Sequence, residues 1–118
     1  MHLNDSVLLP WPPRELNPNF RSHWSKKAKA AKAYRKAIWA LAKAGRLGVD
    51  WDGPVHLWVS FMPPDHRHRD DDNMIASFKS GRDGLADALG IDDKRFVTHP
   101  WVSSETGGKV LVRITKGC

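Results

Sequence analysis

One run of residues bounded by prolines constrains the fold more than any other part of the chain. Between Pro54 and Pro63, apolar residues alternate with others at the two-residue period of a strand that buries one face. The expected buried residues are Val55, Leu57, Val59 and Phe61. Because proline withholds a backbone donor, the strand is expected to end at Pro63. A strand with one buried face requires other elements packed against that face.

A long helix is predicted over residues 25–44, which are rich in Ala and Lys. Its apolar residues recur at helical spacing, and Gly45 is placed to end it. The stripe expected to face the core consists of Ala31, Tyr34, Ile38 and Leu41. On or near the opposite side lie Lys29, Lys32, Lys36 and Lys43, which form either a solvated face or a set of contacts for an anionic partner.

A second helix is predicted over residues 72–89. Asp72 stands where an Asp or Asn caps the exposed amides of a first turn, and Gly90 is placed to end the helix. The buried side is expected to consist of Met74, Phe78, Leu85 and Leu89. Because glycine lowers helix stability, a kink or a close contact is expected at Gly81 and Gly84.

Shorter runs complete the expected sheet. Residues 7–9 predict a short strand, and residues 110–115 alternate apolar and polar side chains after a Gly-Gly turn. Residues 97–102 are expected to form an edge strand, because Pro100 cannot donate to a ladder. The order strand, helix, strand, helix, strand, strand predicts an α+β fold, with a mixed β-sheet and helices packed on one side. With 118 residues and 41% hydrophobic content, residues 1–118 are expected to form a single small domain.

Composition narrows the possible partners. Nineteen Lys and Arg residues against thirteen Asp and Glu residues give a formal net charge of +6, which favours an anionic partner and nucleic acid above others. Residues 1–6 lack the pattern of a signal peptide, and no apolar run reaches the length of a membrane span. We therefore expect a cytoplasmic protein with no membrane contact. The only cysteine is Cys118, so we expect neither an intramolecular disulfide nor a cysteine-based zinc site.

Acidic residues cluster at both ends of the second predicted helix. Asp70, Asp71 and Asp72 are consecutive and follow a loop rich in arginine and histidine. Consecutive carboxylates repel one another unless a helix N-terminus or a divalent cation offsets the repulsion, and capping alone explains one acid well and three poorly. The pair Asp92 and Asp93 follows the helix, although such a pair is also common in turns. The two groups meet only if the chain turns back, because a straight helix of this length separates its ends by about 25 Å.

A further motif, Pro-Trp-Pro-Pro, lies near the start of the chain at residues 10–13. The later residues of interest, in order, are Arg67, Arg69, Asp70, Asp72, Asn73, Asp92 and Asp93. In this arrangement the chain resembles the RusA family of Holliday-junction resolvases. That family combines an early Pro-Trp-Pro-Pro segment, a basic loop, an Asp-x-Asp-Asn motif that opens a helix, and an Asp-Asp pair after the helix. The match covers most of the chain in the order of its elements.

The resemblance implies a magnesium-dependent endodeoxyribonuclease that resolves Holliday junctions or related branched DNA by paired strand cleavage, in DNA recombination and repair. It implies a homodimer in which Asp70, Asp72 and Asp93 are the catalytic residues that hold Mg²⁺, with a lesser role for Asp92. Hard oxygen ligands suit Mg²⁺, which activates a water molecule and neutralises charge on the phosphate.

The basic residues also take their expected roles from this resemblance. Arg67 and Arg69 match the basic loop of the family and are expected to hold DNA phosphates. The family has an essential lysine one helical turn after the second aspartate, where this sequence has Ala76. Lys79 is the expected catalytic replacement, because a position seven residues after the second aspartate returns to the same face of a continuous helix. Arg82 is the rival candidate.

Other functions remain as alternatives. A non-catalytic basic module would bind DNA or RNA through the lysine-rich helix, and Lys29, Lys32 and Lys36 are expected to contact nucleic acid in either case. The aspartates favour the enzyme, because without a metal they would repel phosphates. The loop also resembles the start of the metallo-β-lactamase pattern, but Asp71 stands where that pattern has histidine. A calcium loop is excluded by the missing glycine and distal glutamate. Flaps and other branched DNA remain open as substrates.

Overall fold

The computed structural model describes residues 3–117, so Cys118 and the expectation that depends on it lie outside the described residues. The strands are β1 (Ser6–Pro10), β2 (Val55–Met62), β3 (Phe96–Val102) and β4 (Lys109–Thr115). The α-helices are α1 (Trp24–Ala44), α2 (Asp71–Ser77) and α3 (Lys79–Leu89), and the short 3₁₀ helices are η1 (Arg14–Leu16) and η2 (Asp93–Arg95). No helix in this part of the chain has the length and apolar character needed to cross a membrane.

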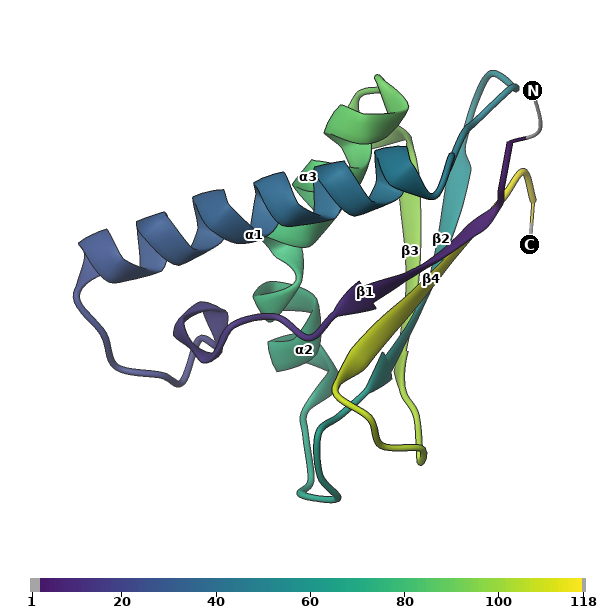
Figure 1. The fold of residues 1–118 in the computed structure, drawn as a ribbon. Helices are drawn as coiled ribbons and strands as arrows, with labels where there is room; N and C mark the ends of the chain where they lie inside the picture. The colour runs from purple at the N-terminus through teal and green to yellow at the C-terminus, as the bar shows by residue number, and fades with distance from the viewer. Residues whose placement is uncertain (1–2, 118) are drawn as a thin grey trace.

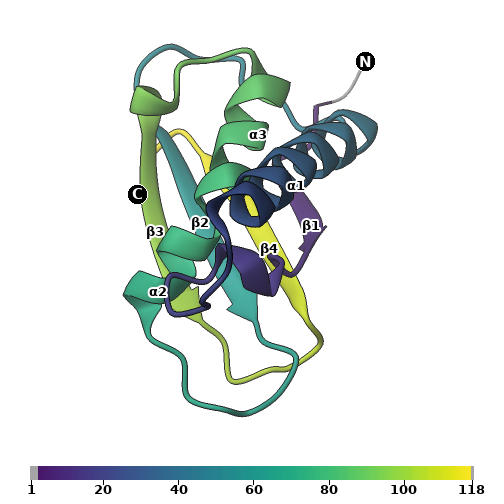
Figure 2. The same cartoon turned by 90° about the vertical axis from the view of Figure 1, so that its left-hand side faces the viewer.

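The four strands form one mixed sheet in the order β1-β4-β2-β3. Strand β4 pairs antiparallel with β1 and with β2, whereas β3 pairs parallel with β2 and occupies an edge. The helices lie on one face of this sheet, with α1 crossing over α3 (Figures 1 and 2). The predicted α+β fold with a mixed sheet and helices on one side is confirmed.

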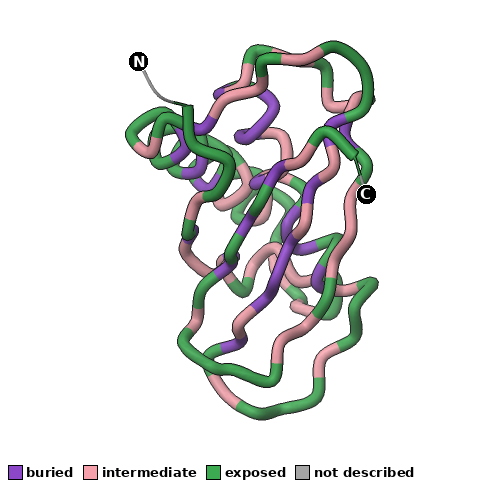
Figure 3. Tube along the Cα trace, turned by 90° about the vertical axis from the view of Figure 1, so that its right-hand side faces the viewer, coloured by how far each residue is buried: buried purple, intermediate pink, exposed green. Residues whose placement is uncertain are grey.

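The core lies between the sheet and the helices. Figure 3 shows the alternation of buried and accessible residues along the strands, and all four apolar residues predicted to be buried in β2 are at most 1% exposed. On α1 the buried residues are Tyr34, Ile38 and Ala42, so the prediction for Leu41 is wrong, since it is 40% exposed. The buried residues follow one i, i+4 ridge, the geometry by which two helices pack ridge into groove.

The second predicted helix is interrupted, which corrects its predicted course over residues 72–89. The chain leaves helical geometry at Phe78, where φ is −91° and ψ is 0°, and α3 begins at the next residue. The Phe78 ring is buried and makes edge-to-face contacts with Phe61 and Tyr34 at centroid distances of 5.8 and 6.3 Å. Burial of this ring between the sheet and α1 accompanies the break, which lies before both helix glycines.

The helix glycines mark close contacts rather than a kink. A Cβ atom added at Gly84 would lie 2.4 Å from the backbone oxygen of Arg35 on α1. Beside this contact, Arg35 forms a bidentate ion pair with Asp87 of α3, at 2.7 and 2.9 Å. Glycine therefore allows the backbones of α1 and α3 to approach each other. Of the two alternatives predicted for Gly84, a kink or a close contact, the structure shows the close contact.

We expect Gly84→Ala to lower the free energy of unfolding by about 1–3 kcal/mol, because the added methyl group overlaps a backbone atom that cannot move independently. Urea denaturation measures this change. Ser80→Ala in the same helix is the control, since it removes a buried hydroxyl that has no hydrogen-bond partner among residues 3–117. Its stability should be unchanged or higher. Equal stability of Gly84→Ala and the parent would contradict the close approach of the helices.

Candidate active site

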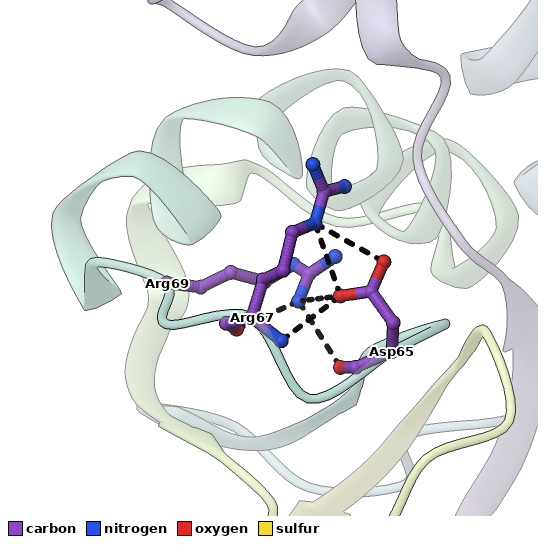
Figure 4. Close-up of polar contacts among 3 residues, drawn as sticks. All are labelled: Asp65, Arg67 and Arg69. Carbon is purple, nitrogen blue, oxygen red and sulfur yellow. Dashed lines mark hydrogen bonds and ion pairs between the residues drawn. The ribbon is translucent and has the colours of Figure 1, made fainter.

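The basic loop between β2 and α2 is organised around one carboxylate, that of Asp65 (Figure 4). The backbone amide of Arg67 donates to Asp65 Oδ1 at 3.0 Å, and the Arg67 Nε donates to Oδ2 at 3.1 Å. Arg69 Nη1 donates to the same Oδ1 at 3.0 Å and to the backbone oxygens of Asp65 and Arg67 at 3.2 and 2.9 Å. Sequence reasoning missed this role of Asp65, although an Asp two residues before an exposed basic residue is a common signal for an Asx turn.

The two arginines of this loop have different surroundings. The Arg69 side chain is only 13% exposed, and its guanidinium lies over the Trp11 ring at 5.6 Å. Its contacts hold the loop to the Pro-Trp-Pro-Pro segment. The Arg67 side chain is 80% exposed and pairs with Asp65 on one side only. Arg67 is therefore the better placed of the two to contact an external anion, whereas Arg69 stabilises the loop from inside.

The Asp65 carboxyl should make this part of the fold sensitive to acid. The hydrogen bond from Arg69 and the amide of Arg67, with a smaller effect of the Arg67 side chain, lower the pKa of Asp65 from 3.8 to about 2. A carboxyl whose pKa is depressed in the folded state stabilises that state above its unfolded pKa and loses this effect as the pH falls through its folded pKa. The contribution should therefore be complete at neutral pH and disappear between about pH 4 and pH 2.

We expect Asp65→Asn to lower stability at pH 7, and the difference from the parent to shrink as the pH falls from 4 to 2. Urea unfolding midpoints over this range measure the effect. Asp52→Asn, in the exposed loop before β2, is the matched control and should leave the pH dependence unchanged. A difference that stays constant with pH would show that the carboxylate charge of Asp65 is not the source of the stabilisation.

The three consecutive aspartates lie at the start of α2. The N-cap is Asp70, not Asp72 as predicted, and its Oδ1 accepts a hydrogen bond from the amide of Asp72 at 3.0 Å. Asp71 and Asp72 occupy the first turn, where the partial positive charge of the helix N-terminus favours carboxylates. All three residues are exposed. The helix thus begins one residue earlier than predicted, because the chain at Asp70 is still extended and offers its side chain as the cap.

The second acidic pair has two distinct roles in the fold. Asp92 caps η2, and the hydrogen bond from the Lys94 amide at 2.9 Å lowers the pKa of the Asp92 carboxyl. Asp93 is held by Arg82 of α3, whose Nη2 donates to the Asp93 backbone oxygen at 3.0 Å and whose Nη1 lies 3.7 Å from Asp93 Oδ2. The Asp93 side chain remains 45% exposed. The chain therefore turns back after α3, as a shared acidic site would require.

The structure does not bring the three predicted metal ligands into one cluster. Within residues 3–117, no group of three His, Cys, Asp or Glu side chains is arranged to hold a metal ion. The donor chemistry of Asp70, Asp72 and Asp93 suits Mg²⁺, but in this structure the three carboxylates are not gathered around one point. Asp70 accepts from the backbone of α2, whereas Asp93 is held against α3 by Arg82. Like charge also opposes a closer approach of the carboxylates.

The two candidates for the basic catalytic residue, Lys79 and Arg82, have different interaction partners. Lys79 is 78% exposed, and its Nζ lies 3.7 Å from Asp83 Oδ2. Lys79 was expected on the same face as Asp72 because a continuous helix was predicted. The break at Phe78 interrupts that helix, so this reason for choosing Lys79 no longer holds. Arg82 instead contacts Asp93 directly.

The remaining predicted contacts lie on the surface. Lys29, Lys32 and Lys36 are exposed along α1, and Lys29 lines a groove of about 480 Å³ between α1 and the segment that precedes it. His66 and His68 are also exposed. The three lysines suit contacts with a large anionic partner, because exposed lysine side chains commonly contact phosphate oxygens.

Comparison with known proteins places the chain in a family. No protein-family model matches the chain. A protein of Xylella fastidiosa (strain Temecula1) described as uncharacterized is 48% identical over 115 residues, which are 93% of this chain and 75% of the relative. The crossover junction endodeoxyribonuclease RusA of Escherichia coli (strain K12) is 30% identical over 116 residues, which are 94% of this chain and 93% of the relative. The protein of the same name from Shigella sonnei gives the same values. Because this similarity extends over nearly the whole of both chains, the chain belongs to the RusA family.

Proposed function

We propose that this protein is a magnesium-dependent endodeoxyribonuclease that resolves Holliday junctions or related branched DNA by paired strand cleavage, in DNA recombination and repair. The observation that carries the proposal is the similarity over 94% of the chain to an enzyme named crossover junction endodeoxyribonuclease. The acidic residues Asp70, Asp72 and Asp93, which would serve a metal-dependent nuclease, support it. The net charge of +6 suits a DNA partner.

In this proposal Asp70, Asp72 and Asp93 would hold Mg²⁺, which when bound would activate a water molecule and neutralise charge on the phosphate. Because these side chains do not form one cluster within residues 3–117, a shared ion requires the start of α2 and η2 to approach each other. The break at Phe78 separates α2 from α3, so a shift at the start of α2 need not be transmitted along one continuous helix. Arg82 positions Asp93 for this role.

DNA would be held by the exposed basic side chains rather than by the buried one. Arg67 projects from the loop that leads to Asp70, and Lys29, Lys32 and Lys36 extend the positive surface along α1. Arg69 contributes indirectly, because it keeps the loop in place. Loss of Arg69 should therefore disorder the loop, whereas loss of Arg67 should weaken phosphate binding and lower the salt dependence by about one unit.

We also propose that the active form is a homodimer, because a four-way junction is resolved by two symmetrical cuts and one chain contains one set of acids. Trp24, Trp39 and Trp101 are 75%, 41% and 45% exposed, which leaves apolar surface for a partner. Sedimentation over a wide concentration range should show a dimer under the conditions of cleavage. Monomers that make paired cuts at the full rate would contradict this part of the proposal.

The alternative is a basic module that binds nucleic acid without cleaving it, and the exposed lysines of α1 favour it. One experiment separates the two. Synthetic four-way junctions, flaps and linear duplexes of the same sequence are incubated with the protein, with and without Mg²⁺. If the protein is the proposed nuclease, we expect Mg²⁺-dependent cuts at symmetrical positions in the junction and little cutting of the duplex. Binding without cleavage of any substrate would favour the module.

A further inference from the structure

A cavity of about 420 Å³ lies beside the acidic end of the basic loop. One wall is formed by the Pro-Trp-Pro-Pro segment and the start of η1, and the opposite wall by residues 64 and 67–69 of the loop. Met74 and Ser77 of α2 also line the cavity. Binding sites for small molecules commonly have volumes of about 300–1,000 Å³, so this cavity suits a ligand the size of one nucleotide.

The charges around this cavity select an anion. Arg14, Arg67, His68 and Arg69 contribute to its lining, and no acidic residue does. The carboxylate of Asp65 pairs with the loop arginines but does not line the cavity. Both Arg14 and Arg67 have side chains that are 80% exposed, and Arg14 has only a 3.4 Å contact with Glu15 as a competing ion pair. The Arg14 and Arg67 guanidinium groups can therefore each offer charge-assisted hydrogen bonds to a phosphate.

The rest of the lining suits a nucleobase. Pro12, Pro13 and Met74 provide flat or adaptable apolar surface against which a base can lie. Asn17 also lines the cavity, and its Oδ1 accepts a hydrogen bond from the Asn19 amide at 2.9 Å. That contact orients the Asn17 side chain and leaves its amide hydrogens to donate to a base edge. An apolar wall with one oriented polar group is the usual composition of a specific small-molecule site.

We propose that this cavity binds one unstacked nucleotide next to the phosphate that is cleaved. The proposal rests on the proposed function, since the position of the cut is taken from Asp70, the residue that follows Arg69 of the cavity wall. A base within a stacked duplex cannot enter a cavity between two protein walls, so the nucleotide must leave the stack. The cavity therefore favours DNA in which a base is unpaired or easily unpaired, as at the centre of a branched junction.

A second groove supports a path for the strand that carries this nucleotide. The groove of about 480 Å³ along α1 shares Arg14 with the cavity and is lined further by Arg21, Lys26 and Lys29. Phe20 lies in this groove and is covered by the Arg14 guanidinium at 5.3 Å. A strand whose nucleotide occupies the cavity can thus pass Arg14 and continue along the basic side of α1.

Base unstacking tests this proposal without cleavage. Junctions with 2-aminopurine at successive positions near the crossover are bound by the full-length protein in EDTA, and fluorescence is recorded at saturation. We expect an increase of several-fold at one or two adjacent positions, because 2-aminopurine brightens when it leaves the base stack. Arg14→Gln and Asn17→Ala should each reduce the increase by at least half. Lys116→Gln, at an exposed position after β4 and outside the lining of both the cavity and the groove, should retain it.

Two outcomes separate this inference from the proposed function. Saturable junction binding and Mg²⁺-dependent cleavage with no fluorescence increase at any position would overturn the nucleotide site and leave the nuclease proposal intact. A fluorescence increase that depends on Arg14 and Asn17, without cleavage in Mg²⁺, would support the site and contradict the nuclease. A fluorescence increase that survives both substitutions would place the unstacked base elsewhere and would also overturn the inference.

Discussion

Asp70→Asn is expected to reduce Mg²⁺-dependent cleavage of a four-way junction by about 10²-fold or more, because it removes one charged ligand of the proposed metal ion. The fold should remain intact. Asp70 caps α2 by accepting a hydrogen bond from the Asp72 amide, and the side-chain oxygen of asparagine caps a helix as well as that of aspartate. The substitution therefore removes the charge and keeps the structural contact.

Binding should separate from cleavage in this variant. A carboxylate near DNA phosphates repels them when no metal intervenes, so Asp70→Asn should bind junctions in EDTA as tightly as the parent or more tightly. Gel-shift titration and single-turnover cleavage measure the two properties. Asp71→Asn is the matched control, since Asp71 also lies at the start of α2 but is not a proposed ligand. Mg²⁺-dependent cleavage by Asp70→Asn at the parental rate would contradict the assignment of the loop.

Arg82→Ala is expected to lower cleavage by about 10- to 100-fold, the usual effect of removing a residue that orients a metal ligand. Arg82 contacts the backbone and carboxylate of Asp93, and its guanidinium also covers the Phe96 ring at 5.4 Å. Lys79→Ala should have a much smaller effect, because Lys79 pairs with Asp83 rather than with a proposed ligand. Single-turnover rates at several Mg²⁺ concentrations distinguish the two.

If Arg82 positions Asp93, its loss should change the Mg²⁺ dependence of cleavage, which a simple loss of stability would not do. Arg82→Ala should require a higher Mg²⁺ concentration for half-maximal cleavage than the parent. Arg82→Lys should require a concentration between those of the parent and Arg82→Ala, since lysine keeps the charge but not the planar donor geometry. Thermal unfolding of each variant shows whether the fold persists. If Lys79→Ala loses cleavage and Arg82→Ala does not, the basic catalytic residue is the one predicted from the sequence rather than the one favoured by the contacts.

Local patterns were sufficient to predict most of the fold. The bounds of β2 agree with the prediction, because strict alternation and flanking prolines are properties of neighbouring residues. The break at Phe78 was not predictable in this way. It is associated with the packing of the Phe78 ring against Phe61 and Tyr34, which are 17 and 44 residues distant in the sequence. A local helix pattern contains no information about such partners.

The candidate site shows the same division. The order of the basic loop, the acids and the Asp-Asp pair was visible in the sequence, but the contact between Arg82 and Asp93 depends on the path of the chain after Gly90, which adopts a left-handed conformation. The different surroundings of Arg67 and Arg69 were also hidden. Their neighbouring positions in one loop give no sign that one is exposed and that the other lies against the Trp11 ring.

The proposed function depends on Asp70, Asp72 and Asp93 sharing one divalent cation. Crystals grown with a synthetic junction and Mn²⁺ in place of Mg²⁺ would test it through the anomalous signal of manganese. We expect a peak bonded to carboxylate oxygens of all three residues, at about the 2.0–2.2 Å typical of small divalent cations, with the start of α2 and η2 closer together than in this structure. A fully occupied peak at other residues, or three aspartates that remain apart on bound DNA, would contradict a shared metal site.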